Sequence, residues 1–288
     1  MIAMDIDGTL LNSQAQVSED NACTIAEAQS RGIEIVLVTG RRYDFARPIA
    51  DAVPCDLHFI TNNGAIIKSK DGVTDLRHLL PSDIAREVLE STEEFRSGAA
   101  VIFDRPRQNQ VMMEHVDWDH PIRGRYLRRN REFIGVVSPL TACLNGDDPI
   151  QVGYADNCKN ARATMKLLEN LPIAEQYTLA LTEYEERDLS ILDVLKRGVS
   201  KGVALEEWAR RKGVAREEVM AMGDNWNDRE MLEFAGLPIV MGNSVPELKT
   251  RGWTVTLTND QNGVAEAIRT YALGAGSADP SCVTGPRA

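Results

Sequence analysis

The sequence lacks the features that would tie its fold to disulfides or to a membrane. Its 5 cysteines are odd in number and far apart, and no pair has the spacing of a zinc site or a redox motif. They are Cys23, Cys55, Cys143, Cys158 and Cys282. No stretch approaches the roughly 20 apolar residues needed to span a bilayer. These absences predict reduced thiols and no membrane partner.

Positive charge is also scarce. The 288 residues contain 32 lysines and arginines against 43 acidic residues, for a net charge of -11. Because nucleic-acid binding through phosphates needs a basic surface, this balance predicts no nucleic-acid partner. A small phosphorylated molecule is still allowed, since local cations can hold one phosphate. The first residues show no signal-peptide pattern, so a cytoplasmic location is expected.

Short apolar runs recur along the chain, each ending in a polar or glycine-containing turn. Runs of this kind are typical of strands buried in a parallel sheet. They cover residues 2–4, 33–38, 57–60, 219–222 and 237–241. Helical patterns separate them, and Ser18 is placed to cap the first helix. The alternation predicts a doubly wound, Rossmann-like α/β core, in which ligands bind beyond the carboxyl ends of the strands.

The middle of the chain has a different pattern. Helix-like segments at 83–95 and 161–171 mix with strand-like pieces at 99–103, 133–137, 149–154, 177–182 and 189–194. This pattern predicts an α+β domain inserted into the core. We therefore expect a core from 1–80 and 195–273, an inserted domain at 81–194, and a flexible tail without function at 274–288.

Two carboxylates follow the first apolar run, in Asp5-Ile6-Asp7-Gly8-Thr9-Leu10-Leu11. Residues two apart in extended chain project to the same side. Asp5 can attack phosphorus and form an aspartyl-phosphate. Asp7 can protonate the leaving oxygen and then deprotonate the attacking water. Taken alone, the pair is equally typical of a solvated Asx turn or a simple metal site.

Two further segments offer groups that suit a phosphate. Thr39 and Gly40 follow the second apolar run, where a hydroxyl and a backbone N–H can cradle an anion, although a helix cap is the simpler interpretation of this piece. Lys201 stands at a helix start, where a cation opposes the helix dipole. Its expected task is to neutralise the nucleophile and the phosphoryl group, with an ordinary solvated lysine as the alternative.

Acidic residues also follow the fourth apolar run, in Gly223-Asp224-Asn225-Trp226-Asn227-Asp228. Mg²⁺ takes oxygen ligands and needs few carboxylates besides water and phosphate. Asp224 at a strand end and Asp228 at the next helix start can reach the same ion as Asp5. Asp228 is also explained as an acid that favours a helix N-terminus. The pattern predicts a Mg²⁺ cofactor.

Together these motifs resemble the haloacid dehalogenase superfamily of phosphohydrolases. They are DIDGTLL at 5–11, LVTGRR at 37–42, Lys201, and GDNWNDREML at 223–232. The insertion after ITNNGA at 60–65, together with GNSVPELK at 242–249, is similar to the Cof-type branch. The resemblance spans nearly the whole chain except the tail. It implies a phosphatase with a cap that closes over the site and supplies leaving-group contacts.

The resemblance also assigns roles to individual residues. It implies Asp5 as the nucleophile, Asp7 as the general acid and base, and Thr39 and Lys201 as phosphate binders. Asn62 and Asn227 match positions that touch the phosphate or order the loops. The magnesium ligands implied are Asp5, the Asp7 carbonyl and Asp224, with Asp228 in support.

The expected reaction is hydrolysis of a small phosphorylated metabolite, such as a sugar phosphate. Alternatives are a phosphosugar mutase of the same superfamily, which returns the phosphoryl group to a sugar, and a non-catalytic phosphate-binding protein on the same fold. A signalling receiver also uses Asp, Thr and Lys with magnesium, but the paired acids on the first strand and the large insertion argue against it. The oligomeric state expected is a monomer or a small homo-oligomer.

One basic segment has no assigned role. Five arginines lie between Arg123 and Arg131 in the predicted inserted domain. They are interpreted either as a patch that recognises a second anion or as a solvated surface, and the latter is favoured because charge runs commonly lie on surfaces.

Overall fold

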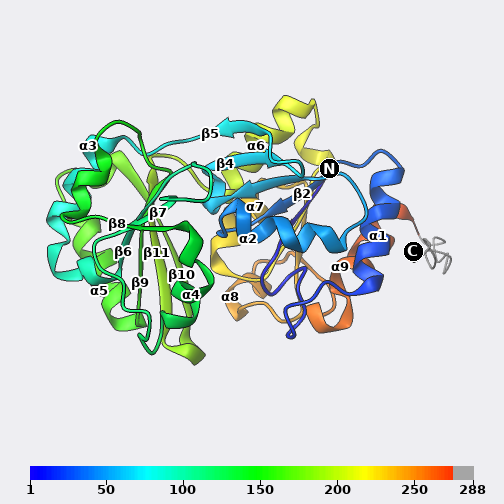
Figure 1. The fold of residues 1–288 in the computed structure, drawn as a ribbon. Helices are drawn as coiled ribbons and strands as arrows, with labels where there is room; N and C mark the ends of the chain where they lie inside the picture. Colours follow the sequence, from blue (N-terminus) through cyan, green and yellow to red (C-terminus); the bar gives the residue numbers. More distant parts are fainter. Residues whose placement is uncertain (275–288) are drawn as a thin grey trace, which may run out of the picture. The chain divides into compact units, whose positions relative to one another are not determined.

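The fold was analysed in a computed structural model, which describes residues 1–274 apart from the side chain of Glu186 (Figure 1). The chain forms two compact units. One comprises Met1–Asp75 and the chain from Lys201 onward, and the other comprises Leu76–Ser200. The boundaries predicted from the sequence lie between residues 80 and 81 and between residues 194 and 195. The tail expected at 274–288 lies, from residue 275 on, outside the described residues.

The first unit is built on strands that alternate with helices. Its strands are β1 (Ile2–Asp5), β2 (Ile35–Val38), β3 (His58–Thr61), β4 (Ile66–Ser69), β5 (Thr74–Arg77, across the junction), β12 (Met220–Gly223), β13 (Leu237–Val240) and β14 (Thr254–Val255). Its helices are α1 (Glu19–Ser30), α2 (Tyr43–Ala46), α6 (Lys201–Lys212), α7 (Arg229–Phe234), α8 (Pro246–Lys249) and α9 (Gly263–Ile268).

These strands form one sheet in the order β14-β13-β12-β1-β2-β3-β4-β5. Neighbours from β14 to β3 are parallel, and β4 returns antiparallel to β3. The first strand is therefore central, with β2 on one side and β12 on the other. The direction of winding reverses between β1 and β12, and such a reversal opens a crevice at the carboxyl ends of the strands. The prediction of an α/β core with a parallel sheet is confirmed.

The apolar runs became strands because both faces of the sheet are covered. Residues 2–5 and 35–38 are buried at every position. On one face Met4, Leu37 and Phe59 pack against a cluster that includes Ile25 of α1 and Val264 of α9. Helices α6 and α7 contact β3, β12 and β13. A strand covered on both faces has no solvated side, so its sequence is apolar throughout.

The second unit pairs a mixed sheet with helices. Its elements are α3 (Ser82–Ser91), β6 (Ala99–Ile102), β7 (Val111–Met113), α4 (Gly124–Arg129), β8 (Ile134–Val136), β9 (Gln151–Asp156), α5 (Cys158–Glu169), β10 (Tyr177–Tyr184) and β11 (Leu189–Lys196). The sheet order is β10-β11-β9-β6-β7-β8. One face carries the apolar cluster in which Tyr154 and Leu192 meet Val88 and Leu168 of the helices. Within residues 1–274, no helix has the length and apolar character to cross a membrane.

The five arginines around α4 do not form one patch. Arg123 is buried and donates from Nη1 to the carbonyl of Ser97 at 2.5 Å. Arg128 donates to the carbonyl of Trp118, and the guanidinium of Arg131 lies over the ring of the same tryptophan. Only part of the segment therefore fits the predicted solvated surface, since one arginine is built into the unit.

Helices α1 and α9 are joined by one buried hydrogen bond. Oδ1 of Asn21 accepts from the N–H of Ala265 at 3.0 Å, and Asn21 is 1% exposed. Ala265 lies in the first turn of α9, where backbone N–H groups have no acceptor within the helix. Asn262, which precedes the helix, provides no side-chain cap. Asn21 therefore caps α9 from another part of the chain.

Asn21→Ala should lower the free energy of unfolding by about 1–3 kcal/mol, because it leaves a buried N–H group without an acceptor. Urea unfolding followed by circular dichroism measures the change. Asn170→Ala is the control, since that side chain donates to the carbonyl of Lys166 on an exposed surface. Equal losses in the two variants would contradict the capping role.

Candidate active site

The polar residues predicted from sequence follow four neighbouring parallel strands. Asp5 ends β1, and Asp224 follows β12 on one side of it. Thr39 follows β2 and Asn62 follows β3 on the other side. Because parallel strands end at the same edge, these residues are gathered at one edge of the sheet, on both sides of β1.

A lysine held between two aspartates forms the centre of the site. Nζ of Lys201 donates to Oδ1 of Asp5 and to Oδ1 of Asp228, each at 2.6 Å. Lys201 is 2% exposed, Asp5 is 5% exposed and Asp228 is fully buried. Charged groups are buried in proteins only when they are paired, because unpaired burial costs several kcal/mol per ion. Each member of this group therefore requires the others.

Asp228 also shapes the loop that carries Asp224. Its Oδ2 accepts from the backbone N–H groups of Asp224 at 3.0 Å and Asn225 at 3.1 Å. Gly223 makes room for this contact, since a Cβ atom there would lie 2.6 Å from the Cβ of Asp228. One carboxylate thus fixes both the lysine and the loop, and both of its oxygens are engaged.

Asp224 approaches the loop that follows β1. Oγ1 of Thr9 donates to its Oδ1 at 3.1 Å. Gly8 has φ +84°, and a Cβ atom at that position would lie 2.3 Å from Oδ2 of Asp224. Glycine is therefore required at position 8, both for the backbone conformation and for the space that Asp224 occupies. The amide of Asn243 donates to the carbonyl of Gly8 at 2.8 Å and holds the loop from outside.

Burial and neighbouring carboxylates raise the pKa values of two acids in the cluster. Burial raises the pKa of Asp5 well above its ordinary value, against the opposing effect of Lys201. Burial and the nearby Asp228 raise the pKa of Asp224 to about 7. For Lys201 burial acts to lower the pKa, but the two flanking carboxylates raise it above the ordinary value. An additional cation would be stabilised here.

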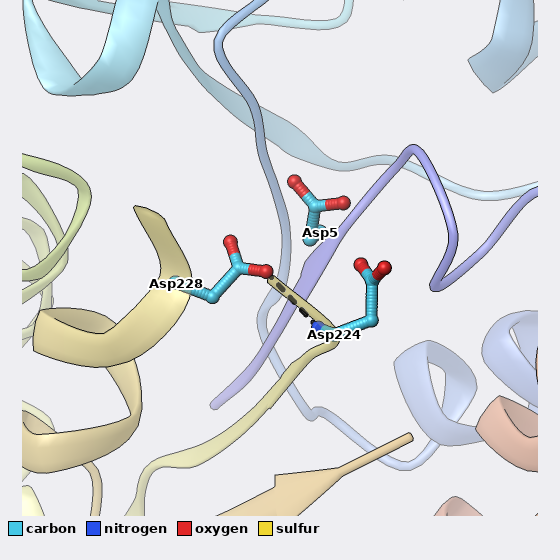
Figure 2. Close-up of side chains that lie close together, drawn as sticks. All are labelled: Asp5, Asp224 and Asp228. Atoms are coloured by element: carbon cyan, nitrogen blue, oxygen red, sulfur yellow. Dashed lines mark hydrogen bonds between the residues drawn. The ribbon is translucent and has the colours of Figure 1, made fainter. Parts of the chain in front are cut away.

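The geometry of the acids suits a divalent metal ion. One carboxylate oxygen from each of Asp5, Asp224 and Asp228 lies within 4.8 Å of the others. Figure 2 shows Asp5 at the end of β1, Asp224 just after β12 and Asp228 at the start of the helical segment that follows. Oxygen-only donors of this kind are the ligands that Mg²⁺ takes, with water completing the shell. Asp5 and Asp224 have oxygens to offer, whereas those of Asp228 are already hydrogen-bonded.

The remaining predicted residues lie in the loops after β2, β3 and β12. Thr39 is buried, and its Oγ1 accepts from the N–H of Arg41 at 3.1 Å. A Cβ atom on Gly40 would lie 3.0 Å from the side chain of Asn63. The N–H of Asn62 donates to the carbonyl of Arg41 at 3.0 Å, which joins the two loops. Asn227 is half-buried in the loop after β12.

Asp7 lies beside the buried acids but is not part of their hydrogen-bonded group. Its side chain is 40% exposed and is paired with Arg41. The structure therefore brings Asp5, Asp224, Asp228 and Lys201 into one group. Asp7 is paired separately, with the guanidinium of Arg41. Sequence reasoning assigned no role to Thr9, Arg41 or Asn243. All three lie inside motifs that were recognised, so their position in those motifs was an available signal.

Binding of Mg²⁺ should depend on pH through Asp224. Its pKa of about 7 in the folded protein lies above the value of about 3.9 expected of an unfolded aspartate. Without metal, this carboxyl contributes stability that is present below the unfolded pKa and is lost as pH rises through about 7. Since Mg²⁺ requires the deprotonated form, it should raise Tm more at about pH 8 than at about pH 5.5.

Thermal unfolding with Mg²⁺ and with a chelator at both pH values tests this expectation. Asp224→Asn should lose most of the Mg²⁺ response at the higher pH. An identical rise in Tm at both pH values, or a full response in the variant, would show that Asp224 is not a ligand.

Asp228→Asn should destabilise the protein by about 3 kcal/mol or more, because it removes one partner of a buried charge pair. The amide oxygen can still accept from the loop N–H groups, which turns its NH₂ group toward Nζ of Lys201. The variant therefore loses both the charge pair and the hydrogen bond to Lys201, while the loop contacts are kept. Asp51→Asn is the control, since Asp51 is 64% exposed and pairs with Arg47 at the surface. The control should change the free energy of unfolding by less than about 1 kcal/mol, and comparable losses in the two variants would show that the buried ion pair contributes no more than a surface pair.

Curated relatives cover nearly the whole chain. Phosphatase YwpJ of Bacillus subtilis is 29% identical over 93% of this chain and 98% of its own length. The 5-amino-6-(5-phospho-D-ribitylamino)uracil phosphatase YcsE of the same organism is 28% identical, with 95% and 96% covered. HMP-PP phosphatase of Escherichia coli is 28% identical, with 86% of each chain covered.

Solved structures agree with this comparison. A haloacid dehalogenase-like hydrolase from B. subtilis has a TM-score of 0.77 at 27% identity, with 94% of this chain and 99% of that chain covered. Another from Bacteroides thetaiotaomicron has a TM-score of 0.74 at 25% identity, with 93% and 97% covered. The family model of the haloacid dehalogenase-like hydrolases matches residues 2–268. The chain therefore belongs to the haloacid dehalogenase-like hydrolase family, and within it to the phosphatases.

Proposed function

We propose that the enzyme is a magnesium-dependent phosphatase that hydrolyses a small phosphorylated metabolite through an aspartyl-phosphate on Asp5. The observation that carries this proposal is the buried group of Asp5, Lys201 and Asp228 beside Asp224. A solvated pair of acids would not need a buried lysine between strand ends. An anionic nucleophile that must meet an anionic phosphate does need that positive charge.

In the first half of the reaction, the Asp5 carboxylate attacks phosphorus and the bond from phosphorus to the leaving oxygen breaks. Asp7 gives its proton to that oxygen, so the products are an alcohol and the aspartyl-phosphate. In the second half, Asp7 takes a proton from water, and the resulting hydroxide attacks phosphorus. This step releases inorganic phosphate and returns Asp5 to its carboxylate form.

Lys201 supplies a fixed positive charge to the reacting group. It contacts Asp5 directly, so it holds one oxygen of the nucleophile in place. Thr39 and Gly40 are assigned to the phosphate oxygens, and Asn62 and Asn227 to ordering the loops around them. Asp228 acts through Lys201 and the Asp224 loop, as its two occupied oxygens indicate.

The metal ligands proposed are Asp5, Asp224 and the backbone carbonyl of Asp7, with Asp228 in support. The Asp7 side chain is held by Arg41, so a contact from this residue would come from its carbonyl. Mg²⁺ bound there supplies positive charge that offsets the repulsion between the nucleophile and the phosphate.

The class of substrate proposed is a small phosphate ester such as a sugar phosphate. One relative is named for 5-amino-6-(5-phospho-D-ribitylamino)uracil, itself a small phosphorylated molecule. The unit Leu76–Ser200 is assigned to recognition of the leaving group as a cap. In this proposal all the catalytic residues come from the first unit.

Phosphate release from a panel of phosphorylated metabolites, with Mg²⁺ and with a chelator, tests the proposal. Asp5→Asn should abolish turnover, because an amide side chain lacks the nucleophilic carboxylate oxygen that forms the aspartyl-phosphate. Asp7→Asn should lower it by about 10²–10⁴-fold for substrates whose leaving group needs a proton. Circular dichroism confirms the fold of each variant, and Asp51→Asn serves as the control.

Unchanged hydrolysis in a folded Asp5→Asn variant would contradict the proposal. Product analysis with a hexose phosphate separates the mutase alternative, since a mutase yields an isomer and little free phosphate. Binding of phosphate without turnover of any member of the panel would indicate the non-catalytic alternative.

A further inference from the structure

Arg41 makes a two-pronged contact with Asp7 beside the carboxylate cluster. Its Nε donates to Oδ2 at 2.6 Å, and its Nη2 donates to Oδ1 at 2.5 Å. Both oxygens of one carboxylate are thus engaged by one planar guanidinium. Such a bidentate pair fixes the direction of the carboxyl as well as its distance.

The backbone of Arg41 is itself held on both sides. Its N–H donates to Oγ1 of Thr39 at 3.1 Å, and its carbonyl accepts from the N–H of Asn62 at 3.0 Å. Asn62 has φ +51°, in the left-handed region that asparagine tolerates better than most residues. The guanidinium therefore extends from a backbone segment that hydrogen bonds hold in place, in the loop after β2 and against the loop after β3.

The orientation of the Asp7 carboxyl depends on a side-chain partner more than the orientation of Asp5 does. Asp5 is buried and bonded to Lys201, whereas the side chain of Asp7 is 40% exposed. The backbone of the Asp7 loop is tied by the bond from the N–H of Leu11 to the carbonyl of Ile6 and by a bridge between Asp7 and Leu11. These bonds leave the side-chain torsions of Asp7 free, and an exposed side chain samples several rotamers.

We propose that Arg41 is a positioning residue that orients the carboxyl of Asp7 toward the leaving oxygen of the substrate. This inference rests on the proposed function, in which Asp7 is the general acid. A general acid must lie within hydrogen-bond reach of the oxygen it protonates. The guanidinium uses one lone pair on each oxygen of Asp7, and the transferred proton occupies a lone pair that remains. Without Arg41 the carboxyl is still present, but it spends less time directed toward the leaving oxygen. Lysine would keep the charge and lose the two-pronged contact.

The test compares substrates that differ in their need for a proton. The phenolate of p-nitrophenyl phosphate leaves without protonation, whereas the alkoxide of an alkyl phosphate does not. The alkyl substrate is the one that the wild-type enzyme hydrolyses fastest. The ratio kcat/KM is measured because it covers steps up to departure of the leaving group and excludes the later attack of water. The variants are Arg41→Met, Arg41→Lys, Asp7→Asn and the double variant Asp7→Asn/Arg41→Met.

Arg41→Met should lower kcat/KM for the alkyl phosphate by about 10- to 100-fold and for p-nitrophenyl phosphate by less than about 3-fold. Arg41→Lys should fall between Arg41→Met and the wild type. The double variant should be no slower than Asp7→Asn alone, because the two residues act through one group. Arg47→Met is the matched control, since Arg47 pairs with Asp51 at the surface, and it should leave both ratios unchanged.

Equal losses on both substrates in Arg41→Met would overturn the inference and indicate direct contact with the phosphate. Additive losses in the double variant would overturn it as well. Failure of the proposed function gives a different result: Asp7→Asn would then show no preference between the two leaving groups. The role of Arg41 and the role of Asp7 are thus tested separately.

Discussion

The site depends on a buried lysine that pairs with two buried aspartates contributed by distant parts of the chain. Asp5 lies 196 residues from Lys201, and Asp228 lies 27 residues beyond it. Burying these charges separately would cost several kcal/mol each, so the folded state requires all three to meet. The same contact places a positive charge against the proposed nucleophile. Stability and chemistry therefore depend on one set of hydrogen bonds.

The two acids of the first motif occupy different environments although only one residue separates them. Asp5 is buried beside Lys201, and burial raises its pKa. Asp7 is partly exposed and faces an arginine. The motif thus provides two carboxylates in different surroundings, which agrees with the different tasks proposed for them, attack on phosphorus and transfer of a proton. The family relationship explains why the core is of this type, while the proposed proton transfer depends on contacts such as that of Arg41.

Much of the fold was predictable because its signals are local. Buried strands on both sides of β1 have continuous apolar sequences, and Ser18 caps α1 as predicted, accepting from the N–H of Asn21. The missed elements have weaker signals. Strand β5 reads Thr-Asp-Leu-Arg at the sheet edge, and β7 has only 3 residues. Helix α4 lies within the arginine-rich segment, where one buried arginine could not be told from its exposed neighbours.

The sequence by itself determined the α/β class, the strands that carry the site, and the set of residues gathered there. Those properties follow from hydrophobic periodicity and from motifs whose residues are close in the chain. Only the tertiary structure decided which acid each cation pairs with: Lys201 with Asp5 and Asp228, and Arg41 with Asp7. It also showed that Asp228 is occupied by hydrogen bonds and that Asn21 caps a distant helix. Contacts between residues far apart in the chain depend on how strands and loops pack, and no local pattern encodes that geometry.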